Sequence, residues 1–316
     1  MSFMTAAVML ASAATMPSAE IRTTIRDVRA IAMTHGATIW PGFERAAIEV
    51  DVIDGQVEHL FCRKAATGFS PARRDPVTGC SVVTRRRVLP IDLAASFDIS
   101  PGMQVIAIGT PAALDMDRAA WKMTLLHESF HQYQAGLPGY ATAVASIRAV
   151  IGSDGTDWAL NYPFPYADPT VATAFGGMTA AAGAFLAAPD PAAAATAIRQ
   201  YRRARRLAEN AIGQRAWQYY EFQAGQEGVA RWTEIVLAEA ASRDDPALTS
   251  IARDRRLGLA NSLRAIDEQG ISMWKRSAFY VLGAIEAEML NRQRPGWRAD
   301  YIRAPFSMGK HLDALD

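Results

Sequence analysis

Residues 115–136 read DMDRAAWKMTLLHESFHQYQAG, and the rest of the sequence is interpreted outward from this stretch. Its apolar residues recur at the spacing of one helix face, and the glycines and proline of Gly136–Gly139 follow where a helix would end. The pattern therefore predicts a helix over Asp115–Gln134. The side chains that would bury this helix are Ala119, Ala120, Trp121, Leu125, Leu126 and Phe130.

The predicted helix contains an HExxH pattern, His127-Glu128-Ser129-Phe130-His131. Residues four apart lie on the same helix face, so both imidazoles can reach one ion. Glu128 lies beside the first histidine, where its carboxylate can reach a water on the metal rather than the metal itself. The alternative is a core helix whose two histidines only satisfy hydrogen bonds.

A catalytic zinc site needs a third protein ligand, and no further histidine follows at close range. Residues 226–234 read QEGVARWTE, in which Glu227 and Glu234 are seven apart and share a helix face. Gly228 and Ala230 are small, which would let this helix lie close to the HExxH helix. The competing carboxylate, Glu221, lacks this context of small residues.

Together, HExxH and the later E-G-x-A-x-aromatic-x-E resemble the gluzincins, the zinc peptidase group that includes thermolysin and the membrane-alanyl-type aminopeptidases. The resemblance covers only Leu125–Gln132 and Gln226–Glu234, and the second element is most similar to the aminopeptidase branch. It implies a zinc ion held by His127, His131 and Glu227. The aminopeptidase motif G-x-M-E-N does not occur, so aminopeptidase specificity is not implied.

The same resemblance implies roles for four further features. Glu128 would be the general base, and Glu234 would orient a histidine from behind the ligands. Gluzincins supply a Tyr or His from a later helix to stabilise the oxyanion, and Tyr280 in AFYVLG (278–283) is the candidate. Its alternative reading is a tyrosine packed at a helix surface. The strands before Asp115 would supply a sheet edge for an extended peptide.

The order of predicted elements gives an α+β fold, with a strand-rich part at 20–112 followed by a helical, zincin-like part at 113–316. Two apolar runs around Asp54-Gly55 predict a hairpin of Ala47–Val52 and Val57–Cys62. The other expected strands are Ser81–Leu89 and Met103–Ile108, with a loop over Thr67–Gly79. The expected helices are Ala180–Ala197 with a break at its prolines, Ala197–Leu207, Gln214–Ala241, Leu248–Glu268 and Trp274–Arg292, and Gly152–Ala174 is expected to be irregular.

Composition excludes some classes of function. The 33 basic and 32 acidic residues give a net charge of +1, so nothing indicates nucleic acid as a partner. No segment is long and apolar enough for a stable membrane span. Five arginines in Arg199–Arg206 recur around a helix, which favours a solvated face over an anion site.

The N-terminus is typical of an export signal. Residues 5–16 read TAAVMLASAATM, an apolar run followed by small residues, which predicts a signal peptide over 1–19 and a periplasmic or extracellular protein. The alternative is an alanine-rich first helix in a cytoplasmic protein. If the chain is exported, Cys62 and Cys80 are expected to form a disulfide.

These patterns lead to one expected function and two alternatives. The expected protein is a zinc-dependent metallopeptidase acting on a peptide or protein substrate. The first alternative is a zinc hydrolase of non-peptide amides or esters, which would use the same ligands. The second is a non-catalytic helical binding protein with a vestigial metal site, and the intact Glu128 counts against it.

Overall fold

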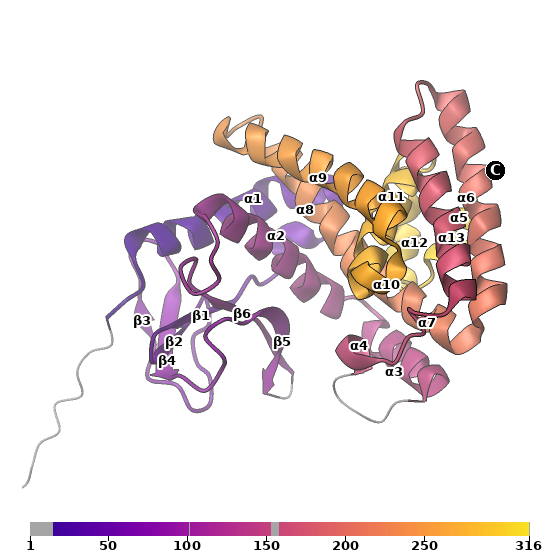
Figure 1. Ribbon diagram of the computed structural model, residues 1–316. Helices are drawn as coiled ribbons and strands as arrows, with labels where there is room; N and C mark the ends of the chain where they lie inside the picture. The colour runs from indigo at the N-terminus through magenta and orange to yellow at the C-terminus, as the bar shows by residue number, and fades with distance from the viewer. Residues whose placement is uncertain (1–14, 101, 153–157, 316) are drawn as a thin grey trace, which may run out of the picture.

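The computed structural model describes residues 15–100, 102–152 and 158–315 (Figure 1). It contains a mixed six-stranded sheet in the first third of the chain and helices in the rest, which confirms the α+β class. Most of the predicted signal segment, residues 1–14, lies outside the described residues. Among the described helices, none combines the length and apolar character needed to cross a bilayer.

A long helix, α1 (Ala19–Ile39), precedes the sheet, so the prediction of a strand-rich part beginning at residue 20 is wrong there. The helix begins where the Ser18 side chain accepts a hydrogen bond from the Ile21 backbone N–H. Its buried residues recur every three to four positions, which is the period of a helix rather than of a strand. They are Ile21, Thr24, Ile25, Val28, Ile31, Ala32, Gly36 and Ile39.

The sheet has the strand order β3-β4-β2-β1-β6-β5. Its strands are β1 (Val50–Asp54), β2 (Val57–Phe61), β3 (Arg73–Arg74), β4 (Ser81–Arg86), β5 (Ala94–Ser100) and β6 (Met103–Gly109). The predicted hairpin around Asp54-Gly55 is confirmed as β1 and β2, and Gly55 has the positive φ that the turn requires. Two strands were not expected: the two-residue β3 lies inside the predicted loop Thr67–Gly79, and the seven-residue β5 pairs antiparallel with β6 at one edge.

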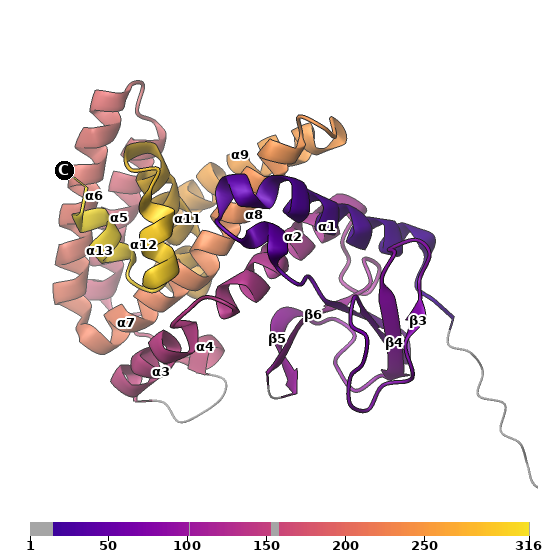
Figure 2. The same cartoon turned by 180° about the vertical axis from the view of Figure 1, so that it is seen from behind.

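Helix α2 (Arg118–Ala135) confirms the helix predicted over Asp115–Gln134 and begins at Asp117, whose side chain accepts from the Ala120 backbone N–H. Figures 1 and 2 show α1 and α2 lying along one face of the sheet. The sheet residues buried in the main core beneath these helices include Val50, Val52, Ile106 and Ile108. This packing fixes α2, and with it the HExxH residues, against β5 and β6.

The remaining helices form the second half of the molecule. They are α3 (Tyr140–Ile151), α4 (Trp158–Asn161), α5 (Pro169–Leu186), α6 (Pro191–Ile212), α7 (Gln214–Gln223), α8 (Val229–Ala241), α9 (Ala247–Gln269), α10 (Ile271–Trp274), α11 (Arg276–Gln293), α12 (Trp297–Arg303) and α13 (Met308–Asp313). The predicted break at the prolines falls between α5 and α6. The segment expected to be irregular, Gly152–Ala174, contains α4 and the first six residues of α5.

The helix predicted over Gln214–Ala241 is interrupted by a π turn, η2 (Ala224–Gly228), which joins α7 to α8. The turn crosses α11 at very close range, because a Cβ added at Gly228 would lie 2.5 Å from the Gly283 Cα atom. The sequence interpretation of Gly228 is therefore wrong in one respect. This glycine allows close approach to α11, and not to the HExxH helix, which packs against α8.

Replacing Gly228 by alanine is expected to destabilise the protein by about 1–3 kcal/mol, since the added Cβ would meet backbone atoms of α11. Gly258→Ala in α9 is the matched control, because a Cβ there would meet nothing within 4 Å. That change is expected to raise the free energy of unfolding by about 0.5–1 kcal/mol through helix propensity. Urea unfolding measures both, and a shift in the same direction for the two variants would contradict the proposed crossing.

Candidate metal centre

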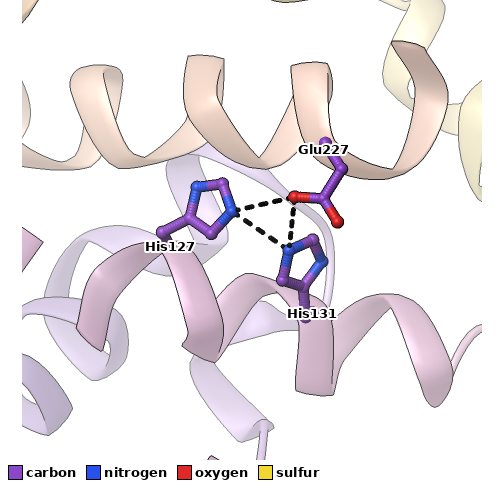
Figure 3. Close-up of side chains that lie close together, drawn as sticks. All are labelled: His127, His131 and Glu227. Atoms are coloured by element: carbon purple, nitrogen blue, oxygen red, sulfur yellow. Dashed lines mark hydrogen bonds and ion pairs between the residues drawn. The ribbon is translucent and has the colours of Figure 1, made fainter. Parts of the chain in front are cut away.

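Two helical segments bring His127, His131 and Glu227 together (Figure 3). Both histidines project from α2 toward Glu227, which lies in the π turn η2. The two Nε2 atoms are 3.1 Å apart, and each lies 3.4 Å from the Glu227 Oε2 atom. The three residues expected as ligands from the sequence thus meet at one point. The π turn that carries Glu227 lies nearly a hundred positions after His131 in the sequence.

The outer nitrogens of both histidines face hydrogen-bond acceptors. His127 Nδ1 lies 3.1 Å from the Glu234 carboxylate on α8, and His131 Nδ1 lies 2.6 Å from the Gln134 Oε1 atom. A carboxylate or an amide oxygen can only accept, so the Glu234 contact places a proton on His127 Nδ1. At His131 Nδ1 the shorter contact with the Gln134 oxygen likewise favours a proton, and the Gln226 amide nitrogen at 2.9 Å competes with it. In the neutral rings the Nε2 lone pairs then point at each other and at Glu227. Glu234 occupies the supporting position that the sequence analysis expected.

Charge in this cluster is shared between the two rings and the carboxylate. Burial lowers the pKa of His127, but its hydrogen bonds to Glu227 and Glu234 outweigh that effect and raise the pKa to about 10. Burial also lowers the pKa of His131, but the negative charge of Glu227 outweighs it, and the net pKa is raised. Burial would raise the pKa of Glu227, yet the two histidines hold it well below the usual range. The cluster therefore favours a positive charge at its centre, which a proton or a metal cation can supply.

Glu128 lies beside this cluster but is not part of it. Its residue is only 7% exposed, and the backbone N–H of Ser96 on β5 hydrogen-bonds its carboxylate. The other oxygen, Oε2, has no hydrogen-bond partner among the described residues. Burial raises the pKa of Glu128, although the positive charge of His131 and His127 opposes the rise. A buried carboxylate with one free oxygen is suited to proton exchange.

Tyr280 is half-buried on α11, the helix that crosses the π turn. Burial and the charge of Glu227 raise the pKa of its hydroxyl well above the usual value, so the hydroxyl stays protonated near neutral pH. Within the described part of the chain, no hydrogen bond joins this hydroxyl to another group. The structure thus places Tyr280 in the electrostatic surroundings of the cluster without direct contact to its three members.

Glu221, the competing ligand candidate, lies in a different buried network. Its carboxylate is 2.8 Å from an Arg205 nitrogen and accepts from the backbone N–H of Gly309. The five-arginine segment of α6 is therefore not wholly a solvated face. Arg205 points inward, whereas Arg202 and Arg206 pair with Asp313 near the surface.

Three residues near the cluster were not anticipated from the sequence. Gln134 is three positions after His131, a helical spacing that could have identified it. Gln226 precedes Glu227 and lies between two groups: its Nε2 is 2.9 Å from His131 Nδ1, and its Oε1 accepts from Tyr140. Ser96 lies on β5, which was not predicted, although the alternation of Ala95, Phe97 and Ile99 with polar residues could have identified the strand.

A cavity of about 1030 Å³ lies between the segment before β1, the β5–β6 hairpin, the end of α2 and the start of α3. Tyr140 lines it, and its hydroxyl bonds Gln226, which in turn contacts His131. His127, Glu128, His131 and Glu227 are not among its lining residues, so the cavity connects to the cluster through Tyr140 and Gln226. Other lining residues are Asp98, Gly102, Gln104, Gln132 and Leu137.

Comparison with known proteins gives no independent identification. No protein-family model, no curated protein and no solved structure matches this chain. Any function assigned to it depends on the residues and their geometry.

Glu227→Ala is expected to abolish high-affinity Zn²⁺ binding, because it removes one of three converging donor atoms. Glu234→Ala should weaken binding about 10–100-fold through the loss of the His127 contact. Glu221→Ala should leave Zn²⁺ affinity unchanged and lower stability by about 1–3 kcal/mol, since Arg205 loses a buried partner. Chelator competition and thermal unfolding separate the two effects. Loss of Zn²⁺ affinity in Glu221→Ala, with Glu227→Ala unaffected, would reverse the assignment.

Proposed function

We propose that this protein is a zinc-dependent metallopeptidase that hydrolyses peptide bonds. The observation that carries the proposal is the convergence of His127 Nε2, His131 Nε2 and Glu227 Oε2, which are 3.1–3.4 Å apart. Donor atoms about 2.0–2.2 Å from a tetrahedral zinc ion are themselves roughly 3.3–3.6 Å apart. The observed spacing is close to that value.

The kind of donor also supports zinc. Two imidazoles and one carboxylate are a ligand set that zinc accepts, and a site with three protein ligands leaves a fourth position for water or substrate. A structural zinc site usually has four protein ligands. The described residues place only three such donors within reach of one point, which favours a catalytic role.

Zinc, when bound, would supply acidity to a coordinated water and polarise a substrate carbonyl. Glu128 is proposed as the general base: its unpartnered Oε2 would accept a proton and return it to the leaving nitrogen. The hydroxyl of Tyr280, which keeps its proton near neutral pH, is proposed as a donor to the developing oxyanion.

The edge strand β5 favours a peptide over a small amide or ester. It is the last strand of the described sheet, so its outer edge is not paired with another described strand. The Ser96 N–H on this strand contacts Glu128, so the edge passes the general base. An extended peptide can add to such an edge through main-chain hydrogen bonds, and the cavity beyond it offers room for side chains.

Export is part of the proposal. Cys62 and Cys80 form a disulfide that links the end of β2 to the start of β4. Disulfides of this kind persist in oxidising compartments, which supports a periplasmic or extracellular location.

The experiment that tests the function combines metal analysis with a base variant. Purified protein is expected to bind about one zinc per chain and to cleave members of a fluorescence-quenched peptide library. Glu128→Gln should keep the zinc and lose activity at least about 100-fold, because Glu128 is a base and not a ligand. Zinc content below about a tenth of a metal per chain after zinc-supplemented expression would refute the metal assignment.

Wild-type protein that binds zinc but cleaves no peptide, while hydrolysing amide or ester probes, would instead support the non-peptide alternative. If Glu128→Gln lost its metal and kept its activity, the roles assigned to the HExxH residues would be wrong.

The disulfide gives a prediction about location. Mass spectrometry of protein isolated from its native compartment is expected to find Cys62 and Cys80 joined, together with a mature N-terminus near residue 15 or 20. Reduced cysteines and an intact Met1 in the cytoplasm would contradict export and leave the metal site unaffected.

A further inference from the structure

Gln134 is a fully buried glutamine on α2, one helical turn beyond His131. Its two amide atoms face different elements. The oxygen Oε1 lies 2.6 Å from His131 Nδ1, and the nitrogen Nε2 lies 3.2 Å from the Gly225 carbonyl and 3.0 Å from the Gln226 carbonyl in the π turn. One side chain thus contacts a proposed ligand and the turn that carries another.

The π turn makes its carbonyl available for this contact. In an α-helix the Gly225 carbonyl would accept from the backbone N–H of Val229. Here the Val229 N–H bonds the Ala224 carbonyl instead, which is the five-residue step of a π turn. The Gly225 carbonyl is buried, so it needs another donor, and Gln134 is one of two that it finds.

Tyr301 on α12 is the second donor. Its buried hydroxyl donates to the Gly225 carbonyl at 2.7 Å and accepts from Gln134 Nε2 at 2.6 Å. With only acceptors around Nε2, the orientation of the Gln134 amide is determined: its N–H groups face the π turn and Tyr301. The oxygen must then face His131.

We propose that Gln134 is a positioning residue that holds His131 in the Nδ1–H tautomer and ties α2 to the π turn, so that His131 and Glu227 meet at metal-binding distance. This inference rests on the proposed zinc site. The two ends of one planar amide make these two contacts. The Gln134 oxygen faces His131 Nδ1 and so leaves the lone pair on His131 Nε2. The Gln134 nitrogen holds the Gly225 and Gln226 carbonyls, next to Glu227.

The two ends can be separated by substitution. Gln134→Leu removes both, whereas Gln134→Glu keeps an acceptor for His131 and loses the N–H groups that bind the π turn. Tyr301→Phe removes only one hydroxyl from the same network. Gln132→Leu is the matched control, since Gln132 is a neighbouring glutamine that ties α2 to the Glu49 backbone and does not contact the histidines.

The test measures Zn²⁺ affinity by chelator competition, together with thermal stability of the metal-free proteins. Gln134→Leu is expected to weaken Zn²⁺ binding about 10–100-fold, with a smaller loss in Gln134→Glu and in Tyr301→Phe. Gln132→Leu should lower stability and leave Zn²⁺ affinity unchanged. In the zinc-loaded wild type, nitrogen-15 NMR should show His131 with its proton on Nδ1, and Gln134→Leu should lose the slow exchange of that proton.

The outcomes distinguish this inference from the function it rests on. Wild-type protein that binds one zinc, with Gln134→Leu binding equally tightly, would overturn the role of Gln134 and leave the proposed function standing. Equal losses of affinity in Gln134→Leu and Gln132→Leu would overturn it as well, because they would indicate general loosening of α2. Wild-type protein without zinc would refute the proposed function itself, and the positioning role with it.

Discussion

Two imidazole nitrogens and one carboxylate oxygen face the same point between α2 and the π turn η2, and the surrounding structure depends on keeping them there. Each atom is an acceptor in the neutral form of the site, so none can satisfy the others. Leaving a buried acceptor without a partner costs about 1–3 kcal/mol, which means that a positive charge at this point stabilises the whole arrangement. A proton on His127, whose pKa is raised to about 10, or a metal cation can supply that charge.

Backbone geometry on the second helix holds the carboxylate in place. The π turn displaces one carbonyl from the helical ladder, and the glycines Gly228 and Gly283 let the turn lie against α11 with no side chain between them. Gln134 and Tyr301 then satisfy the displaced carbonyl from two other helices. Four helical segments, η2, α11, α2 and α12, thus contribute to the position of Glu227.

The sequence predicted the parts of this site that depend on local periodicity. His127 and His131 share a face because they are four apart, and Glu227 and Glu234 because they are seven apart, so their grouping could be read without a structure. The groups that surround these residues could not be predicted in this way. Small size at Gly228 indicates close approach but not the partner, and Glu221 is set apart by Arg205, a contact between segments that no local pattern reveals. Helix α1 was missed although its apolar residues repeat at a helical period.

Strand β5 shows why these omissions matter for function. Its sequence, AASFDIS, alternates apolar Ala95, Phe97 and Ile99 with polar residues, a strand signal that was overlooked. The strand pairs with β6 and packs against α2. Yet Ser96 on this strand holds one oxygen of Glu128 and leaves the other free. The proposed general base is therefore oriented by the same strand whose outer edge would receive an extended peptide. A peptide paired along that edge would lie beside the proposed base, whereas a small amide would make no use of the edge. A strand that was not predicted, although its alternation is present in the sequence, is thus the part of the fold that argues most directly for a peptide substrate.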